Sequence, residues 1–177
     1  MLKSIESTPS IQLAHGGRVG VAQAMGEFSV LAAVPIPAGE VVFRIEGLQV
    51  AVPSRFSVQV DERWHVDLAH GASEAEVILH HPWRFMNHSC DPSARIVGRE
   101  VRALRAILPG DEITFDYDTT EMEMAEPFDC QCGSVGCRGW VGGFVHLDET
   151  NRERLRRLLA PYLMRAVGRT DGARAQA

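Results

Sequence analysis

Three of the four cysteines form a compact cluster with the spacing Cys130-x-Cys132-x4-Cys137, and the fourth, Cys90, lies far upstream. Four cysteines can complete a tetrahedral shell around a structural zinc ion, which lowers the thiol pKa and holds every sulfur as a thiolate. The Cys-x-Cys spacing is not that of a common zinc finger, so disulfides or free buried thiols are the alternatives. A shared zinc ion would tie the C-terminal segment to the chain around Cys90.

Two further polar features accompany these cysteines in the sequence. The pair Asn87-His88 directly precedes Ser89-Cys90, although such a pair alone is more often a turn or a hydrogen-bonded core pair than a ligand site. Tyr117 lies at the end of the expected strand 113–115 and, taken alone, indicates only a half-buried aromatic. Its hydroxyl group could also orient a reactant through hydrogen bonds.

In this order, the three segments 84–90, 110–117 and 130–137 resemble a SET domain followed by a post-SET zinc motif. This is the fold of protein-lysine methyltransferases that use S-adenosylmethionine, and the resemblance spans roughly residues 26–140. It implies a mainly β fold, in which a β-clip-like core of short twisted sheets contains a pseudoknot. A C-terminal post-SET zinc lobe and a C-terminal helix would complete the molecule.

The resemblance also implies a role for each of these residues. Tyr117 would be the catalytic residue. Phe115 occupies the position where the family carries Phe, which leaves room for a water and for higher methylation, or Tyr, which tends to stop at one methyl. The cofactor S-adenosylmethionine would contact Asn87, His88, Tyr117 and Gln131, and one structural zinc ion would bind Cys90, Cys130, Cys132 and Cys137.

The N-terminal part of the cofactor site departs from the family pattern. The family's Gly-x-Gly cofactor loop falls on Glu27, Phe28 and Ser29, so both glycines are missing, and a strand tyrosine of the family falls on Phe56. Phe28 could replace the tryptophan often found in this loop, but a positive φ would be costly for Glu27 or Ser29. We predict that all four residues contact the cofactor. The two departures leave a non-catalytic SET-like binding module as an alternative.

Composition and charge agree with one compact domain. The chain has 177 residues, of which 45% are hydrophobic, and contains no run of about 18 apolar residues. The N-terminus lacks the apolar stretch of a signal peptide, so we expect a cytoplasmic protein, or a nuclear one in a eukaryote. The net charge of -5 argues against direct nucleic-acid binding and suits a basic, lysine-containing protein substrate. We expect no membrane association, and the oligomeric state stays open.

The pattern of turns and apolar residues predicts short strands from Ile11 to Leu68. Alternating apolar residues in 55–60 predict a strand with one buried face, and a short helix is expected around 73–79. Two strand–turn–strand units are indicated, with strands 28–33 and 41–45 around the turn 37–40, and strands 101–107 and 112–115 around the turn 109–111.

The C-terminal part predicts a helix. Residues 150–153 fit a capping box, and Pro161 should kink or end the helix. Its apolar face would consist of Leu155, Leu158, Leu159, Tyr162 and Leu163. We therefore divide the chain into a SET domain (9–120), a post-SET zinc-binding segment (121–143), a C-terminal helical extension (144–167) and a disordered tail (168–177).

These features favour N-methylation of a protein lysine with S-adenosylmethionine as the methyl donor. Because the polar segment 67–84 is short for a peptide-docking insert, a small-molecule acceptor, either an amine or a carboxylate, is an alternative. Glu121, Glu123 and Glu126 form either a solvated acidic loop or an attraction for a basic substrate.

Overall fold

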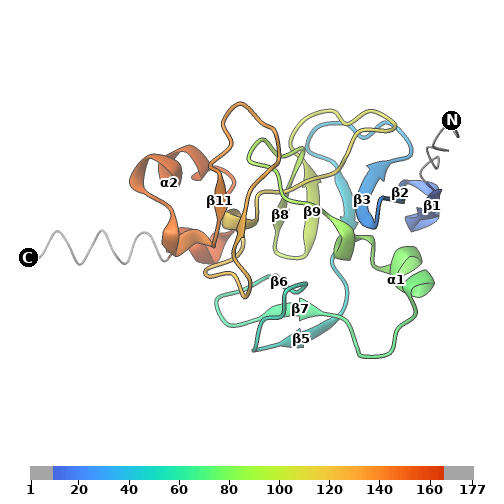
Figure 1. Ribbon diagram of the computed structural model, residues 1–177, viewed down its shortest axis with the longest axis horizontal. Helices are drawn as coiled ribbons and strands as arrows, with labels where there is room; N and C mark the ends of the chain where they lie inside the picture. Colours follow the sequence, from blue (N-terminus) through green and yellow to red (C-terminus); the bar gives the residue numbers. More distant parts are fainter. Residues whose placement is uncertain (1–9, 166–177) are drawn as a thin grey trace, which may run out of the picture.

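The computed structural model describes residues 10–165, which form small antiparallel sheets and a few short helices (Figure 1). The mainly β prediction is therefore confirmed. The strands are β1 Ser10–Ala14, β2 Val19–Ala24, β3 Glu27–Ala32, β4 Val41–Arg44, β5 Leu48–Val50, β6 Val58–Gln59, β7 His65–Asp67, β8 Ala94–Val97, β9 Glu100–Ala103, β10 Phe128–Asp129 and β11 Trp140–Val141. The helices are α1 Glu74–His80 and α2 Glu149–Leu155, with the 3-10 turns η1 His15–Gly17, η2 Pro82–Phe85, η3 Tyr117–Thr119 and η4 Phe144–His146.

The strands of the described residues form four sheets, with the orders β1-β2-β3, β4-β9-β8, β5-β7-β6 and β10-β11. In Figure 1, β8 and β9 lie between the β1–β3 sheet and α2. One apolar core joins the three larger sheets, and Trp83 from η2 is buried in it with its indole N–H donating to Glu46 O at 3.1 Å. Burial of apolar side chains from separate short sheets thus holds the fold together.

The two expected strand–turn–strand units are not hairpins. β3 pairs with β2 and β4 pairs with β9, so the strands on either side of each turn belong to different sheets or to none. The two turns instead lie against each other, because Ile36 and Ile107 exchange backbone hydrogen bonds of 2.9 Å. Residues 112–115 form isolated bridges to 31 and 88 rather than a strand, since different partners flank the segment on its two sides.

The predicted strand at 55–60 is also shorter than expected. The Ser54 hydroxyl accepts hydrogen bonds from the backbone amides of Phe56 and Ser57, which makes the beginning of this segment a turn. Only Val58–Gln59 is a strand, and Phe56 is 52% exposed while Val58 is buried. The alternation rule fails here because it applies only to extended chain. The short helix is confirmed as α1, with a complete capping box between Ser73 and Glu76.

The C-terminal helix was placed only in part. α2 begins at a different cap, because Asp148 rather than Thr150 accepts a hydrogen bond from the third amide of the helix. It ends at Leu155, and Pro161 is the first residue of a second helical segment, 161–165, where its missing N–H costs nothing. The predicted apolar residues still gather in one cluster against η4. The predicted disordered tail lies outside the described residues.

Within residues 10–165, no helix is both long enough and apolar enough to cross a membrane.

Candidate active site and metal centre

The segment that contains Asn87 and His88 runs beside the segment that leads to Tyr117. Phe115 N donates to Asn87 O at 3.3 Å, and Ser89 N donates to Phe115 O at 3.1 Å, which makes a parallel bridge. Residues almost thirty positions apart in the sequence are thereby held side by side. The bridge therefore brings Asn87 and His88 close to Tyr117.

Tyr117 is fixed through its hydroxyl group, its backbone and its ring. The hydroxyl donates to Met86 O at 2.7 Å, the backbone N–H donates to His88 Nδ1 at 3.2 Å, and the ring lies 4.7 Å from that of Phe115. Burial, reinforced by the charges of Glu121 and Glu112, raises the pKa of Tyr117 far above its usual range. Tyr117 therefore stays neutral and cannot act as a base. Because the Tyr117 hydroxyl group donates its hydrogen bond to Met86 O, the lone pairs of the hydroxyl oxygen remain free to accept contacts.

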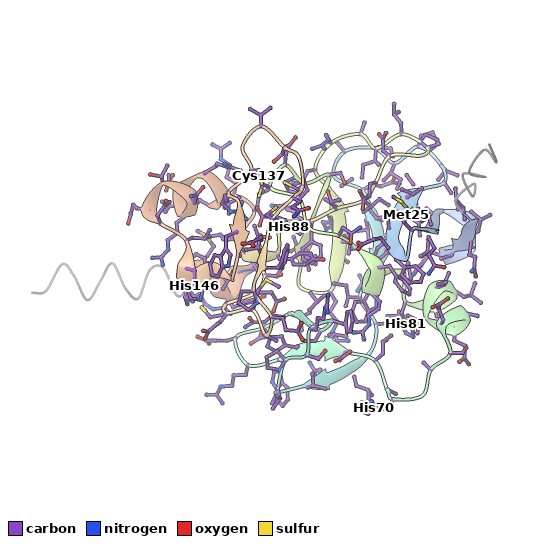
Figure 2. The ribbon with its side chains drawn as sticks, viewed as in Figure 1. Met25, His70, His81, His88, Cys137 and His146 are labelled. Carbon is purple, nitrogen blue, oxygen red and sulfur yellow. The ribbon has the colours of Figure 1, made fainter. Side chains whose placement is uncertain are left out.

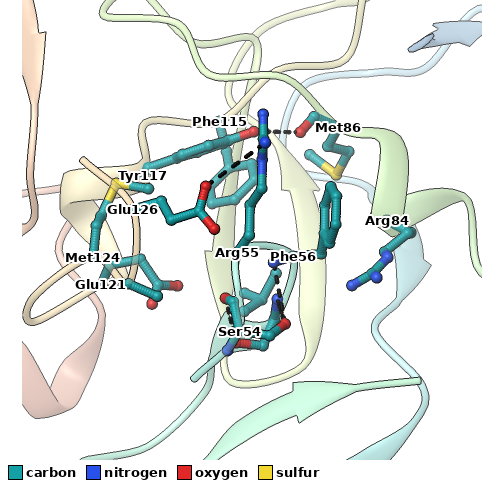
Figure 3. Close-up of a pocket in the computed structure, with 13 residues that line it drawn as sticks. Ser54, Arg55, Phe56, Arg84, Met86, Phe115, Tyr117, Glu121, Met124 and Glu126 are labelled. Atoms are coloured by element: carbon teal, nitrogen blue, oxygen red, sulfur yellow. Dashed lines mark hydrogen bonds and ion pairs between the residues drawn. The ribbon is translucent and has the colours of Figure 1, made fainter. Parts of the chain in front are cut away.

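A pocket lies beside Tyr117 (Figure 3). Its volume is about 70 Å³. This space suits the end of one side chain better than a whole nucleoside. The lining includes Phe56, Arg84, Met86, Phe115, Tyr117 and Glu121. The Arg84 guanidinium lies over the Phe56 ring, 4.2 Å from its centroid, and also donates to Asp67 at 3.0 Å.

The acidic stretch after Tyr117 divides into residues in different environments. Glu121 is only 7% exposed and lines the pocket, with Oε1 accepting from Gln59 N at 2.8 Å and Oε2 lying 3.5 Å from His65 Nε2. Glu126 lines the same pocket and pairs with Arg55 across 3.6 Å, where both side chains are largely exposed. Glu123 lies away from the lining, with its side chain 72% exposed. The solvated-loop interpretation therefore fits Glu123 and does not fit Glu121.

The region predicted to bind the cofactor is a strand rather than a loop. Glu27, Phe28 and Ser29 belong to β3, and the positive φ values of this region fall on Met25 and Gly26 in the preceding turn. Glu27 and Ser29 therefore do not have the positive φ values that would strain their backbone. The Asn87 side-chain amide donates to Phe28 O and to Glu112 Oε1, each at 2.8 Å, and the Phe28 ring lies 4.6 Å from that of Phe85.

The other predicted cofactor residues are more widely spread. Phe56 is part of the pocket beside Tyr117, whereas Gln131 and Glu27 are exposed. The structure thus brings together Phe28, Asn87, His88 and Tyr117 through direct contacts, with Phe56 joined through the pocket.

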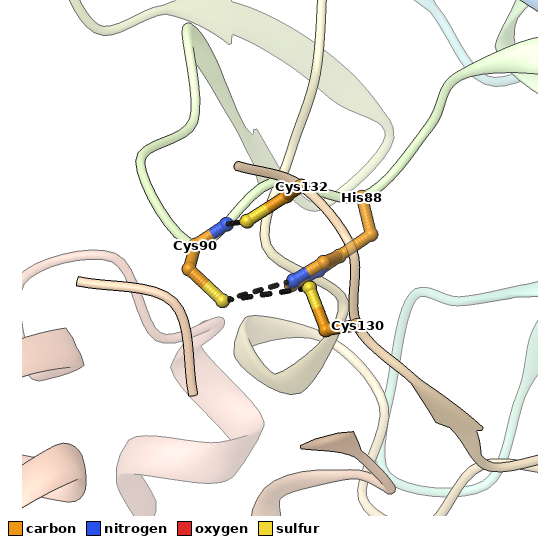
Figure 4. Close-up of side chains that lie close together, drawn as sticks. All are labelled: His88, Cys90, Cys130 and Cys132. Atoms are coloured by element: carbon orange, nitrogen blue, oxygen red, sulfur yellow. Dashed lines mark hydrogen bonds between the residues drawn. The ribbon is translucent and has the colours of Figure 1, made fainter. Parts of the chain in front are cut away.

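Three of the four cysteines meet beside His88 (Figure 4). The Sγ atoms of Cys90, Cys130 and Cys132 and one ring nitrogen of His88 all lie within 4.8 Å of one another. The Cys90 and Cys130 sulfurs are 3.9 Å apart, close to the separation of about 3.8 Å that a tetrahedral zinc–thiolate site requires. Cys137 adjoins this set, with its Sγ 3.6 Å from Cys130 O. The donor set fits zinc.

The fourth ligand could be His88 or Cys137, and the hydrogen bonds of His88 favour Cys137. Burial, together with the charge of Arg138, lowers the pKa of His88 to about 4, so the ring is neutral near pH 7. Its Nδ1 accepts the Tyr117 N–H, so the ring proton is on Nε2. Nε2 lies 3.2 Å from Cys90 Sγ and donates to it. A nitrogen that carries a proton has no lone pair for a metal.

The thiols differ in how readily they ionise. Burial acts to raise the pKa of Cys132, but hydrogen bonds from the Ser134 hydroxyl and the Cys90 amide outweigh it and bring the pKa to about 6. Burial raises the pKa of Cys90 and of Cys130 above the usual range for a thiol. Two buried thiols that resist ionisation alone suit a site where a cation supplies the compensating charge.

Sequence reasoning assigned no role of their own to Arg84 and Arg138, which the structure places at this site, and it left the role of Glu121 open. Arg84 and Glu121 line the pocket, and Arg138 makes a buried ion pair with the two aspartates that flank Tyr117. The available signals were weak. Arg84 was noted only as part of a matching segment, and the position of Arg138 beside Cys137 suggested no role.

The sequence profile of the SET domain matches residues 27–118, slightly more than half of the chain. The chain therefore belongs to the SET domain family. The profile ends before the cysteine cluster at 130–137, so it does not include the post-SET segment.

Several methyltransferases share part of this sequence. The chain is 40% identical over 74 residues to the histone-lysine N-methyltransferase Set2 of Drosophila melanogaster. The aligned region covers 37% of this chain and 3% of that protein. It is 44% identical over 63 residues to the methyltransferase flvH of Aspergillus flavus, and this aligned region covers 33% of this chain and 35% of flvH. An H3 lysine-36 specific histone-lysine N-methyltransferase of Chaetomium globosum is 36% identical over 97 residues, covering 50% and 10%. The matched regions thus span between 3% and 35% of these relatives.

Among solved structures, KRYPTONITE in complex with mCHH DNA, an H3(1-15) peptide and SAH has a TM-score of 0.47 and 22% identity. The match covers 67% of this chain and 28% of that one.

Proposed function

We propose that this protein transfers a methyl group from S-adenosylmethionine to the side-chain amine of a protein lysine. The observation that carries the proposal is the pocket where Phe115, Tyr117 and Glu121 meet. Its size suits the end of a lysine side chain, and the rings of Phe115 and Tyr117 in its lining offer apolar contact to the methylene groups of that side chain. Membership of the SET domain family and the similarity to histone-lysine methyltransferases support the same activity.

The residues around Asn87 suit the cofactor chemically. Phe28 and Phe85 offer aromatic surface for an adenine, and Glu112 offers an anion for an ammonium group. Asn87, His88, the half-buried Ser29 and the exposed Glu27 and Gln131 complete the set that we propose to contact it. When bound, S-adenosylmethionine supplies an electrophilic methyl group, whose bond to sulfur breaks as the lone pair of the amine forms the new N–CH₃ bond.

Tyr117 and its neighbours would orient the acceptor rather than take its proton. The Tyr117 hydroxyl group donates its hydrogen bond to Met86 O, so the lone pairs of its oxygen can accept contacts from the amine and from the methyl group. Tyr117 cannot serve as a base because its pKa is raised. The amine must therefore lose its own proton to solvent before it attacks. Phe56, which is 52% exposed and has the Arg84 guanidinium over its ring, would close one side of the pocket.

The charge of the pocket favours an amine over a carboxylate as the acceptor. Glu121 is buried in the lining, and a negative group at this depth attracts an ammonium and repels a carboxylate. The positive Arg84 and Arg55 are paired with Asp67 and Glu126. Methylation of a small-molecule amine remains a distinct outcome of the tests below.

We propose one structural zinc ion bound by Cys90, Cys130, Cys132 and Cys137. In this proposal residues 121–143 form the post-SET segment and follow a SET domain at 9–120, while 144–167 form the C-terminal extension. Zinc would complete the wall of the site by joining the Cys90 loop to the C-terminal segment.

The dependence of rate on pH tests the identity of the acceptor. If an amine attacks, kcat/KM should rise about tenfold per pH unit between roughly pH 7 and 9, because only the neutral amine has a lone pair and free lysine has a pKa of about 10.4. Tyr117 does not titrate in this range, because its pKa is raised by burial. Initial rates measured with a lysine-containing peptide in buffers of constant ionic strength check this. A flat profile would exclude an amine and indicate a carboxylate acceptor.

Replacing Phe115 tests the space around the amine. Phe115 lines the pocket beside Tyr117, so the added hydroxyl group of Phe115→Tyr should occupy space that a second or third methyl needs. We expect the first methylation within about threefold of the wild-type rate and further methylation to be suppressed. Peptide mass spectrometry, compared at equal extents of first methylation, counts the methyl groups. Unchanged higher methylation in Phe115→Tyr would remove Phe115 from this role.

A further inference from the structure

Arg138, the residue that follows Cys137, binds the carboxylates on both sides of Tyr117. Its two terminal nitrogens donate to the two oxygens of Asp116 at 2.7 and 2.6 Å, and one of them also donates to Asp118 at 2.7 Å. The three side chains are 6%, 0% and 2% exposed, in the order Arg138, Asp116 and Asp118. A two-pronged guanidinium–carboxylate pair fixes direction as well as distance.

The two aspartates in turn define the turn that carries Tyr117. Asp116 caps η3, because its carboxylate accepts from Asp118 N at 3.2 Å and its carbonyl accepts from Thr119 N at 3.0 Å. The other oxygen of the Asp118 carboxylate accepts from Gly143 N at 2.7 Å. The backbone on either side of Tyr117 is thus held by groups that converge on Arg138.

The charges make this arginine difficult to replace. Two buried carboxylates close together in the sequence would repel each other without a cation between them, and each would lack compensation for its lost hydration. Burial acts to lower the pKa of Arg138, but the hydrogen bonds and charges of Asp116 and Asp118 outweigh it and raise the pKa. Arg138 therefore remains charged at every working pH.

Arg138 also belongs to the cysteine loop. Its backbone N–H donates to Cys90 Sγ at 3.4 Å. One residue therefore contacts the candidate metal centre through its backbone and the Tyr117 turn through its side chain.

We propose that Arg138 is a positioning residue for methyl transfer. Through Asp116 and Asp118, it would make the position of Tyr117 depend on an ordered cysteine loop. Its effect on turnover rests on the proposed function, whereas its effect on the order of the Tyr117 turn does not. Small displacements of groups that orient reactants can cost about 100-fold in rate. The prediction is therefore a loss of turnover that is separate from any loss of metal or cofactor.

The test compares Arg138→Lys with Arg154→Lys. Arg154 reaches the same loop from α2, donating to Gly136 O and Cys90 O at 3.0 Å, and does not pair with either aspartate. We expect Arg138→Lys to keep the wild-type zinc content and a cofactor KM within about twofold while kcat falls at least about tenfold. Arg154→Lys should keep kcat within about twofold.

Hydrogen–deuterium exchange measures the order of the turn without requiring activity. In Arg138→Lys, exchange should rise in residues 115–121 and stay unchanged in β8 and β9, whereas Arg154→Lys should leave both regions unchanged. Unaltered kcat and exchange in Arg138→Lys, or equal losses in the two variants, would overturn the proposal. If the wild type shows no turnover, the proposed function fails, and the exchange comparison alone decides the role of Arg138. If Arg138→Lys does not fold, Asp118→Asn replaces it. We then expect a smaller fall in kcat and a smaller rise in exchange in residues 115–121.

Discussion

Tyr117→Phe should reduce kcat at least about 100-fold while leaving the KM for the cofactor within about threefold. Tyr117 lines the pocket, and the contacts of its hydroxyl group with the amine and the methyl group would be strongest in the transition state. A 100-fold loss corresponds to about 2.7 kcal/mol. Single-turnover kinetics with a peptide acceptor, alongside calorimetry for cofactor affinity, separate chemistry from binding.

The same substitution also has a structural consequence that must be measured. Met86 O loses its hydrogen-bond donor in a buried position, which should cost about 1–3 kcal/mol of stability. Tyr162→Phe is a matched control, because the Tyr162 hydroxyl also bonds buried carbonyls, those of Thr120 and Gln59, but lies outside the pocket lining. Its thermal midpoint should fall similarly while kcat at a permissive temperature changes little. Full turnover in Tyr117→Phe would end the catalytic assignment for any acceptor.

Purified protein should contain one zinc ion per chain, and its removal should lower the thermal midpoint by roughly 10 °C or more. The cysteine loop contributes to a small cluster of Cys90, Cys130 and Val141, and the large apolar core lies elsewhere. Without the metal, the buried thiols would hold only each other, and exchange should rise beyond residue 128. Metal analysis and exchange before and after chelation measure both effects.

Single substitutions identify the ligands. Each of Cys90→Ser, Cys130→Ser, Cys132→Ser and Cys137→Ser should lose zinc or bind it far more weakly. His88→Gln should retain it, because the Nε2 of His88 carries a proton and only donates to Cys90 Sγ. Retention by Cys137→Ser together with loss in His88→Gln would instead make His88 the fourth ligand. A disulfide between any two of the cysteines would contradict the metal site altogether.

The sequence could predict those parts of the site whose residues lie in short contiguous segments. The spacing of Cys130, Cys132 and Cys137 and the segment around Asn87 and His88 suggested a shared site, and the structure places Cys90, Cys130 and Cys132 beside His88. The short helix around 73–79 was also predicted, and the capping box that begins it joins residues only three apart, Ser73 and Glu76.

The remaining features depend on partners that are distant in the sequence. No local sequence feature indicates that β4 pairs with β9, or that the turns at 37–40 and 109–111 lie against each other through Ile36 and Ile107. Glu121 looks like its solvated neighbours until Gln59 and His65 are placed around it. Arg138 gains its role only because the cysteine loop returns to Tyr117. Side-chain burial and tertiary pairing thus decided what periodicity and propensity could not.

The central claim is best tested by incubating purified protein with S-adenosylmethionine carrying a labelled methyl group. One portion receives lysine-containing proteins from a cell lysate, a second receives a pool of small metabolites, and Tyr117→Phe is the control for both. Mass spectrometry should find the label on lysine side chains of proteins, with at least about 100-fold less in the control. Label found only on metabolites, or no transfer by a protein that binds both zinc and the cofactor, would contradict protein-lysine methylation.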